Sequence, residues 1–295
     1  MTTLTRSPDL RSERWWESQR ARTLLIAVPI IGWVALWMGG GYVMLFVQAF
    51  WSTDGLNITP GFSLDAFSTA FTSTLYLPVM LRSIGVGLTV ALITTAIAFP
   101  VAYFITFRLR AAKMLVYMLV IVPMWSSYLV RAYAWKIILG EHGVVNEALL
   151  SLGIIRSPLE LLYTPAAVII TLVSIFTPFM ILTIYTTLER IPVALIEASQ
   201  DLGETPLATF RRVVLPLALP GVVAGSIFTL GLAGGDFLAP SLVGAPENIM
   251  IANLIQSQFG ATFNWPLGSA LAMTLLVIIF ALISAASAAE KRETI

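Results

Sequence analysis

The stretch ERIPVALIEASQDLGETPLATFRRVVLPLALPG, residues 189–221, gathers ten Glu, Gln, Asp, Arg and Thr side chains between two long apolar runs. Its first half predicts a short helix. Pro192 suits the first helical position, where a backbone N–H is not needed, and Gly203 can adopt the left-handed conformation that ends a helix. We therefore expect the first helix of the stretch over residues 192–202.

The second half of the same stretch predicts another helix. Thr205 offers a side-chain oxygen for an N-cap, and Pro206 takes the next first position. Pro216 then marks the end of this helix at about Leu215, because proline breaks the hydrogen bonding of a helix interior. The stretch thus predicts a helix, a tight turn and a second helix.

The chain around this stretch has the composition of a membrane protein. Of its 295 residues, 58% are hydrophobic and 11% charged, which excludes a soluble domain with a polar surface. The net charge of +1 gives no attraction for nucleic acid. Cysteine is absent, and the sequence has no paired carboxylates, nucleophile–base set or cluster of metal ligands. We expect neither an enzyme nor a metal site.

Charge-free intervals predict the membrane spans, because a hydrocarbon core of about 30 Å takes roughly 20 helical residues. None of the intervals alternates with period two, so helices are favoured over a β-barrel. The sequence therefore predicts an all-α membrane protein with six transmembrane helices. Their predicted ranges are 24–50, 83–107, 114–130, 161–188, 213–235 and 266–289. We treat residues 24–289 as one transmembrane domain, between tails at 1–23 and 290–295.

Positive charges predict the orientation. Thirteen of the seventeen Lys and Arg residues lie before the first span, between spans two and three, between spans four and five, or after span six. The positive-inside rule places these segments, including both termini and residues 189–221, in the cytoplasm. The segments 51–78 and 244–265 contain no Lys or Arg and are expected outside. In the outer loop after span three, apolar spacing between Gly143 and Gly153 predicts a short surface helix.

The first helix of the polar stretch has an acidic face. The polar side chains at the i, i+3, i+4 and i+7 positions are Glu197, Gln200, Asp201 and Glu204. A connection between two spans needs only a handful of residues, so a shaped polar surface indicates docking of a cytoplasmic protein. The alternative is a hairpin that lies on lipid, but such helices usually carry Lys and Arg on their polar face.

The spacing within this stretch resembles the EAA motif of binding-protein-dependent ABC importer permeases. That motif reads EAA, three residues, G, nine residues, I-x-L-P. Its positions in this chain are Glu197, Ala198, Ser199, Gly203, Val213, Leu215 and Pro216. Ser199 and Val213 depart mildly from the alanine and isoleucine of the family. The runs LVRAYAWKIIL and GGDFLAPSLVG also resemble the spermidine/putrescine-type branch, and the resemblance covers about residues 79–289.

The resemblance implies a type I ABC importer fold in a bacterial inner membrane. It implies two permease subunits, two cytoplasmic ATPases and an external solute-binding protein. The second permease is expected to be a sister protein, with a homodimer as the alternative. None of Lys113, Lys136 and Lys291 follows a glycine, so the chain lacks the phosphate-binding loop G-x-x-x-x-G-K-[ST]. We expect ATP and Mg on the partner ATPase and no cofactor on this chain.

The resemblance also assigns a coupling loop to residues 190–216. In the family pattern the first helix of this loop inserts into a cleft of the ATPase, and Gly203 allows close approach because it has no side chain. The residues expected to couple to the ATPase are Glu197, Ala198, Ser199, Asp201, Leu202, Gly203, Leu215 and Pro216. A rigid helix pair between spans four and five would convert closure of the ATPase into tilting of those spans.

Asp236 is the first candidate residue of a solute pathway. It lies about twenty residues beyond Pro216, near the outer end of span five, where a charge is costly and indicates function. It could attract a cationic solute at an outer gate. The structural alternatives are an ion pair with Arg131 or a helix-end carboxylate that reaches water. Trp125 and Tyr128 join Arg131 as further candidates, with an aromatic belt at the membrane interface as their alternative.

Two other classes of function stay open from the sequence. An ion-coupled secondary transporter would place carboxylates deep within its spans, whereas spans one, two, four and six contain no internal Asp, Glu, Lys or Arg. A channel explains the spans but not the spaced cytoplasmic motif. The solute stays open as well, because the branch indicates polyamines or related organic cations, while related permeases move other small organic solutes.

Overall fold

The computed structural model describes residues 19–55, 57–109 and 111–293. Most of the tail expected at 1–23, and the last residues of the tail expected at 290–295, lie outside this described part. The described chain is mainly helical, and its small sheet pairs β1 (Ser52–Asp54) with β2 (Asn57–Thr59) as an antiparallel hairpin.

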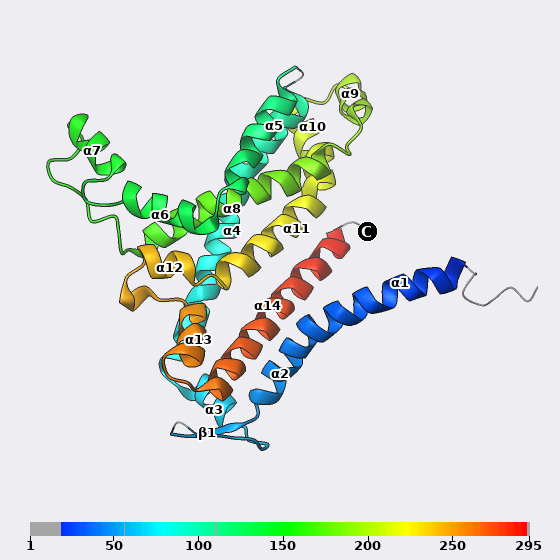
Figure 1. The fold of residues 1–295 in the computed structure, drawn as a ribbon. Helices are drawn as coiled ribbons and strands as arrows, with labels where there is room; N and C mark the ends of the chain where they lie inside the picture. Colours follow the sequence, from blue (N-terminus) through cyan, green and yellow to red (C-terminus); the bar gives the residue numbers. More distant parts are fainter. Residues whose placement is uncertain (1–18, 56, 110, 294–295) are drawn as a thin grey trace, which may run out of the picture.

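Helices of two lengths build the molecule (Figure 1). The long helices are α4 (Tyr76–Phe107), α8 (Pro165–Leu188), α11 (Leu215–Gly234) and α14 (Trp265–Glu293). The first span consists of α1 (Gln19–Val34), the π-helical turn η2 (Ala35–Gly39) and α2 (Gly40–Gln48). The shorter helices are α3 (Asp65–Thr72), α5 (Lys113–Ile121), α6 (Tyr128–Ile138), α7 (Val144–Ser151), α9 (Val193–Asp201), α10 (Pro206–Thr209), α12 (Leu238–Val243) and α13 (Ile251–Gly260). The remaining helical turns are the 3₁₀ helices η3 (Val122–Trp125) and η5 (Pro246–Asn248) and the π-helical turn η4 (Phe210–Val214). Helix α7 confirms the surface helix predicted in the loop after span three.

Five helical stretches of the described chain are long and apolar enough to cross a membrane, and a bent pair makes a sixth candidate. The five are Leu25–Gln48, Tyr76–Phe107, Pro165–Leu188, Pro206–Gly234 and Trp265–Ala285. The bent pair joins Lys113–Trp125 to Tyr128–Ile138 at 93°. The all-α membrane fold predicted from the sequence is confirmed, with corrections at the second and third spans.

The second span begins at Tyr76 rather than at Ser83, because Arg82 lies inside the helix. A search for charge-free intervals excludes such a position. In the structure the Arg82 guanidinium donates to two backbone carbonyls of the loop before α13, that of Glu247 at 2.7 Å and that of Ile249. These acceptors bind both terminal nitrogens of the guanidinium, while its buried Nε has no partner among the described residues, and they let the charged side chain lie near the start of the helix. The predicted start at Ser83 is therefore wrong.

The third span does not run straight through residues 114–130, as the sequence predicted. After α5 the chain tightens into η3 and then takes extended backbone at Ser126 and Ser127. Pro123 has no N–H for a continued helix, and the Ser126 hydroxyl donates to the Pro123 carbonyl at 2.7 Å. Helix α6 therefore leaves this break at 93° to the preceding helix.

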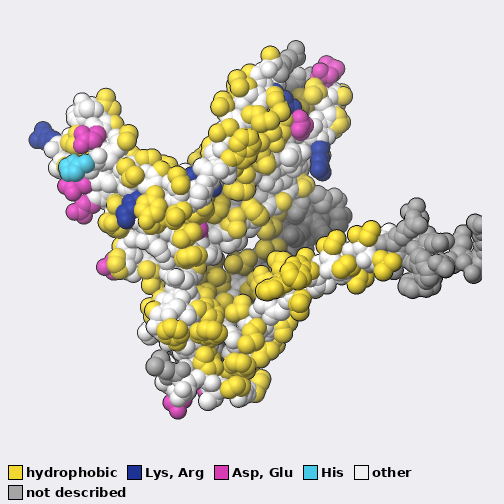
Figure 2. Space-filling model, viewed as in Figure 1, with side chains coloured by type: hydrophobic (Ala, Val, Ile, Leu, Met, Phe, Trp, Pro, Cys, Tyr) yellow, Lys and Arg dark blue, Asp and Glu magenta, His cyan; other side chains and the backbone are white. Residues whose placement is uncertain are grey.

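The packed core lies where α4, α8 and α11 meet. It has two clusters of buried side chains. One includes Leu172 and Phe176 and extends to α6 and α12, while the other includes Ile105, Ile184 and Leu188 and extends to α9. Apolar side chains also cover much of the outer surface in Figure 2, as expected of helices that face lipid. Three packed helices thus join the α9 end of the molecule to the α12 end.

The loops gather at two ends of the described structure (Figure 1). Helix α9, the start of α1 and the end of α14 lie toward one side, while α7, α12, α13 and the β1 hairpin lie toward the other. The loops that charge assigned to opposite sides of the membrane therefore lie at opposite ends of the molecule.

Candidate functional site

The polar stretch forms a helix pair at one end of the bundle (Figure 1). Its first helix, α9, starts at Val193, because Pro192 has extended backbone (φ −63°, ψ 127°) and is the N-cap rather than the first helical residue. Gly203 follows the helix with φ +84°, and its N–H donates to the Gln200 carbonyl at 2.9 Å. The left-handed conformation predicted at Gly203 is confirmed, and the start predicted at Pro192 is one residue early.

The second helix begins as predicted but does not stop before Pro216. Thr205 accepts a hydrogen bond from the Ala208 N–H at 3.3 Å. From α10 the chain continues through the π-helical turn η4 into α11, where Pro216 stands in the first turn. At this junction the Leu215 N–H donates to the Phe210 carbonyl, five residues back. The predicted end at Leu215 is wrong, because the wider turn accommodates the proline within a continuous helix.

Side-chain contacts fix the helix pair to the bundle. The hydroxyls of Ser199 and Thr209 share a hydrogen bond of 3.0 Å, and Thr209 is buried. The Phe210 ring meets the rings of Phe99 and Tyr103 on α4 edge-on, at centroid distances of 5.7 and 5.6 Å. These contacts hold α9 against α10 and root the pair on α4.

The outward face of the pair exposes large apolar side chains outside the predicted spans. Leu202 is 86% exposed and Leu207 is 76% exposed, on either side of the Gly203 turn. The other exposed candidates on α9 are Glu197, Ala198 and Asp201. Leucines exposed beside an open glycine turn indicate a surface that another chain covers. Sequence reasoning included Leu202 but missed Leu207, whose signal was a leucine directly after the proline that starts a short helix.

The remaining coupling candidates lie away from the tip of the helix pair. Ser199 faces Thr209 between the two helices. Leu215 and Pro216 lie in the first turn of α11. Ser199 therefore lies where the two helices of the pair contact each other, and Leu215 and Pro216 lie where the pair continues into the next span.

Lys113 and Glu189 form a contact that sequence reasoning missed. The Lys113 Nζ lies 2.9 Å from the Glu189 Oε1, which joins the start of α5 to the residue after α8. The Tyr185 hydroxyl donates to the same oxygen at 3.0 Å, and the rings of Tyr185 and Tyr117 are 4.8 Å apart. Because Glu189 begins the connection to α9, this contact holds the root of the helix pair.

We expect Glu189→Gln to destabilise the permease slightly and only above acidic pH. The hydrogen bond from Lys113 lowers the pKa of Glu189 below its ordinary value of 4.5. A carboxyl whose pKa is lowered on folding stabilises the protein above its unfolded pKa, and this contribution is lost as the pH falls through the folded value. The two side chains are 29% and 50% exposed, so the effect at neutral pH should stay below about 1 kcal/mol.

Thermal unfolding of the detergent-solubilised protein at low salt checks this expectation. Wild type and Glu189→Gln should differ near neutral pH and converge in acid, once the pH has fallen below the lowered pKa of Glu189. A difference of equal size at neutral pH and in acid would contradict a role for the ionised carboxylate.

Asp236 lies where α11 has ended and α12 begins. Its Oδ1 accepts the Ala239 N–H at 2.8 Å, and its Oδ2 accepts the hydroxyl of Tyr128 on α6. Arg131, one turn further along α6, donates through Nη1 to the Ile175 carbonyl of α8 at 3.3 Å. Among the described residues no ion pair joins Asp236 to Arg131, so the alternative of a charge pair between them is wrong.

A cavity of about 450 Å³ opens beside Asp236. Tyr128, Arg131 and Asp236 line it together with apolar side chains of α8 and α11. Trp125 lies instead in η3, before the break, and is 80% exposed. The structure thus brings three of the four predicted pathway residues into one cavity and leaves Trp125 at the surface, where an interface-belt aromatic would lie.

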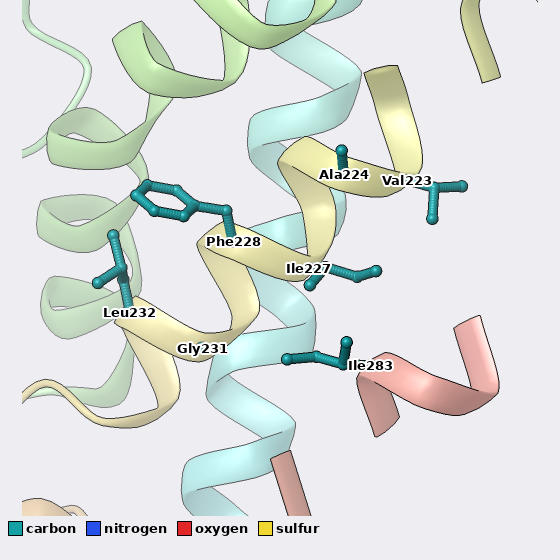
Figure 3. A pocket seen from close by; sticks show the side chains of 7 residues that line it. All are labelled: Val223, Ala224, Ile227, Phe228, Gly231, Leu232 and Ile283. Atoms are coloured by element: carbon teal, nitrogen blue, oxygen red, sulfur yellow. The ribbon is translucent and has the colours of Figure 1, made fainter. Parts of the chain in front are cut away.

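A second hollow, of about 530 Å³, lies against α11 (Figure 3). Its walls are apolar residues of α11 together with Ile283 of α14, and Leu232 lines both hollows. In Figure 3 Phe228 and Leu232 point to one side of α11, while Ile227 points toward Ile283. One face of α11 therefore combines an apolar surface with a single carboxylate beyond its end, a combination that sequence reasoning did not identify.

These features define a class of protein. A bundle of membrane-spanning helices with hollows along one helix, and a rooted helix pair whose tip is uncovered, is the membrane component of a transport system. Residues 95–289 match the family described as binding-protein-dependent transport system inner membrane component. The chain belongs to this family, and it is a multi-pass permease subunit of an ABC importer.

Two curated relatives and one solved structure agree with this membership. Spermidine/putrescine transport system permease protein PotB of Escherichia coli (strain K12) is 36% identical over 253 residues, which are 85% of this chain and 92% of PotB. Inner membrane ABC transporter permease protein YdcU of the same organism is 35% identical over 280 residues, 90% of this chain and 88% of YdcU. A chain in the crystal structure of a bacterial ABC transporter involved in the import of the acidic polysaccharide alginate has a TM-score of 0.74 at 21% identity, over 95% of this chain and 99% of that chain.

The structural likeness confirms the type I importer fold that the motif implied. The family also decides between the classes of function that the sequence left open. An importer permease is driven by ATP on another subunit, so neither an ion-coupled secondary transporter nor a channel describes this chain.

Proposed function

We propose that this permease lines the path of a polyamine or a related organic cation. The observation that supports this most is Asp236, a carboxylate that lines a cavity together with Tyr128, Arg131 and apolar side chains. A solute ammonium group would pair with the carboxylate, and methylene segments between charged groups would suit the apolar hollow along α11. The relative PotB is named for the transport of spermidine and putrescine.

We further propose that the helix pair docks on an ABC ATPase. Two ATPase subunits would bind ATP and Mg, and the coupling loop 190–216 would meet one of them through the Gly203 turn and the exposed leucines beside it. The docking surface would be formed by Glu197, Ala198, Asp201, Leu202 and Gly203, and extended by Leu207. Ser199, Leu215 and Pro216 would set the angle of the helix pair.

The complete importer that we propose contains a second permease subunit, a sister of this chain or a second copy of it. An external solute-binding protein would deliver the solute at the α12 end. Both termini would lie in the cytoplasm of a bacterial cell, with residues 24–289 as the transmembrane domain. The uneven distribution of Lys and Arg supports this orientation.

Asp236→Asn is expected to reduce ATP-driven uptake of putrescine by about tenfold or more, because a hydrogen bond between charged groups is worth about 1.5–3 kcal/mol. The substitution keeps the size of the side chain and removes its charge. Uptake of labelled putrescine and spermidine is measured in proteoliposomes that contain the permeases, the ATPases and the binding protein, with and without ATP inside.

Asp65→Asn is the matched control, since Asp65 is an exposed carboxylate of α3 that forms no ion pair among the described residues. It should take up both polyamines at the wild-type rate. Wild-type uptake by Asp236→Asn for every organic cation tested would overturn the role of this carboxylate in the pathway.

A further inference from the structure

The Asp236 carboxylate has neutral partners in a place where a cation is expected. Its oxygens accept the Ala239 N–H and the Tyr128 hydroxyl, and no ion pair among the described residues includes it. A hydroxyl donates a charge-assisted hydrogen bond to the carboxylate but leaves its charge uncompensated, whereas an ammonium group donates a hydrogen bond and also adds the attraction of an opposite charge. A cation that reaches Asp236 will therefore compete with the partner that is easier to displace.

The two partners differ in how they are attached. The Ala239 N–H belongs to the first turn of α12, three residues after Asp236, so it moves together with the carboxylate. Tyr128 is 108 residues away in the sequence and is the first residue of α6, directly after the bend at Ser126 and Ser127. Only the Tyr128 contact is lost when α6 and the end of α11 move apart.

The helices on either side of this contact are anchored to different neighbours. On one side, Arg131 attaches α6 to α8 through the Ile175 carbonyl. On the other side, Asn253 of α13 donates to the Phe237 carbonyl at 2.9 Å and to the Ser241 hydroxyl at 2.7 Å, which attaches α12 to α13. The hydrogen bond between Tyr128 and Asp236 thus links two helices whose other side-chain hydrogen bonds go to different neighbours.

Both ends of α12 also pack in a core cluster that includes buried residues of α6 and α8. Ala239 belongs to this cluster at the Asp236 end of α12, and Val243 belongs to it at the far end. At the far end the Tyr163 N–H also donates to the Val243 carbonyl at 2.9 Å. Separation of α6 from α12 at Asp236 therefore requires loss of the Tyr128 hydrogen bond and looser packing at Ala239, while the hydrogen bond at Val243 holds the other end.

We propose that Tyr128 is a latch on the solute pathway: its hydroxyl occupies the Asp236 carboxylate in the closed arrangement, and an ammonium group of the solute takes its place as α6 and α12 separate. This inference rests on the proposed function of Asp236. A ligand shifts a conformational equilibrium only through a difference in affinity for the two states. The exchange of a hydroxyl for an ammonium group at one carboxylate supplies that difference.

Tyr128→Phe tests the latch, because it removes the hydroxyl and keeps the ring. A hydrogen bond to a charged group shifts an equilibrium by about tenfold or more, so we expect the ATPase rate of the complete importer without solute to rise at least about threefold. The stimulation of the ATPase by putrescine-loaded binding protein should shrink. Both rates are measured on the reconstituted complex.

Tyr133→Phe is the matched control on the same helix. The Tyr133 side chain is 47% exposed, and its hydroxyl makes no hydrogen bond within the described residues. It should behave as wild type in both assays. A double variant adds a readout that a merely structural defect would not reproduce: in the Asp236→Asn background, Tyr128→Phe should raise the solute-independent ATPase rate less than it does in the wild type.

The results separate failure of the latch from failure of the proposed function. Equal solute-independent ATPase rates for Tyr128→Phe, Tyr133→Phe and wild type overturn the latch, while a loss of putrescine uptake in Asp236→Asn would leave the proposed function standing. The proposed function itself is overturned if putrescine does not stimulate the ATPase of the wild-type complex and Asp236→Asn takes up putrescine normally. The latch is also overturned if Tyr128→Phe raises the solute-independent ATPase rate by the same factor in the wild type and in the Asp236→Asn background.

Discussion

Gly203→Val is expected to reduce ATP-driven uptake at least about tenfold, a change of about 1.4 kcal/mol in coupling, while the permease stays folded in the membrane. The backbone at Gly203 has φ +84°, which costs a residue with a side chain about 1–2 kcal/mol. A Cβ at this position would meet no atom of this chain within 4 Å. The added bulk would therefore obstruct only whatever covers the turn. Uptake in proteoliposomes and co-purification of the ATPase with tagged permease measure the effect.

Gly153→Val is the matched control for this expectation. Gly153 also has a positive φ, +68°, and open space around its Cβ position. It follows α7 at the opposite end of the molecule from α9, so it introduces a similar backbone strain away from the proposed ATPase site. Uptake by Gly153→Val should stay near the wild-type rate. Full uptake by Gly203→Val, or equal losses in the two variants, would contradict docking at the Gly203 turn.

Gly203→Asn separates the shape of the turn from the space around it. Asparagine tolerates the left-handed conformation better than valine does. If close approach of the ATPase is what requires glycine, Gly203→Asn should also lose most of its uptake. Recovery of uptake in this variant would assign the requirement to the backbone conformation instead.

The turn between α9 and α10 was predictable because its signals are local. The capping of a helix depends on residues within one turn of its end, so Gly203 and Thr205 could be assigned without any knowledge of the fold. The proline signals were less specific. A proline can begin a helix, precede it as Pro192 does, or stand within a longer one next to a wider turn as Pro216 does, and the choice depends on the neighbouring hydrogen bonds.

The limits of α4 and the bend before α6 depended on partners outside the local sequence. Arg82 can lie in α4 because the Glu247 and Ile249 carbonyls, more than 160 residues away, accept its donors. The break after η3 had a local signal in Pro123, but many membrane helices contain a proline without breaking. Its consequence, the placement of Tyr128 beside Asp236, was not readable from spacing.

The cost of a charge near membrane depth singles out Asp236 in the sequence, but it does not identify the hydrogen-bonding partner of the carboxylate. Charge alone favoured Arg131 as the partner. In the structure the carboxylate instead accepts a hydrogen bond from the Tyr128 hydroxyl, and Arg131 donates to a backbone carbonyl of α8. A hydroxyl carries no charge signal in a sequence, and 108 residues separate the two groups. The latch proposed here depends on this difference between the two partners.

Gly221→Val is expected to prevent correct packing of α11 on α8. A Cβ at residue 221 would lie 2.3 Å from the Thr187 Oγ1 and 2.7 Å from the Thr187 Cβ, too close for any real contact. Overpacking of a core usually costs about 1–3 kcal/mol. Here the obstructing atoms include the Thr187 Cβ, which is fixed to the backbone near the end of α8 and cannot rotate away. We therefore expect the amount of monodisperse, detergent-stable permease to fall severalfold and the remainder to unfold at lower temperature.

Gly85→Val and a compensating variant test whether this effect comes from the contact itself. Gly85 lies within α4, where a Cβ meets nothing within 4 Å, so Gly85→Val makes the same chemical change in a membrane helix without the clash and should keep most of its stability. Thr187→Gly removes the obstructing atoms and should partly restore Gly221→Val, although glycine itself costs a helix about 1 kcal/mol. Equal stability of Gly221→Val and Gly85→Val would show that α11 and α8 do not need this close approach. A loss confined to Gly221→Val and relieved at Thr187 would show that the close packing of α8 on α11 stabilises the permease, as transmission of force from the helix pair requires.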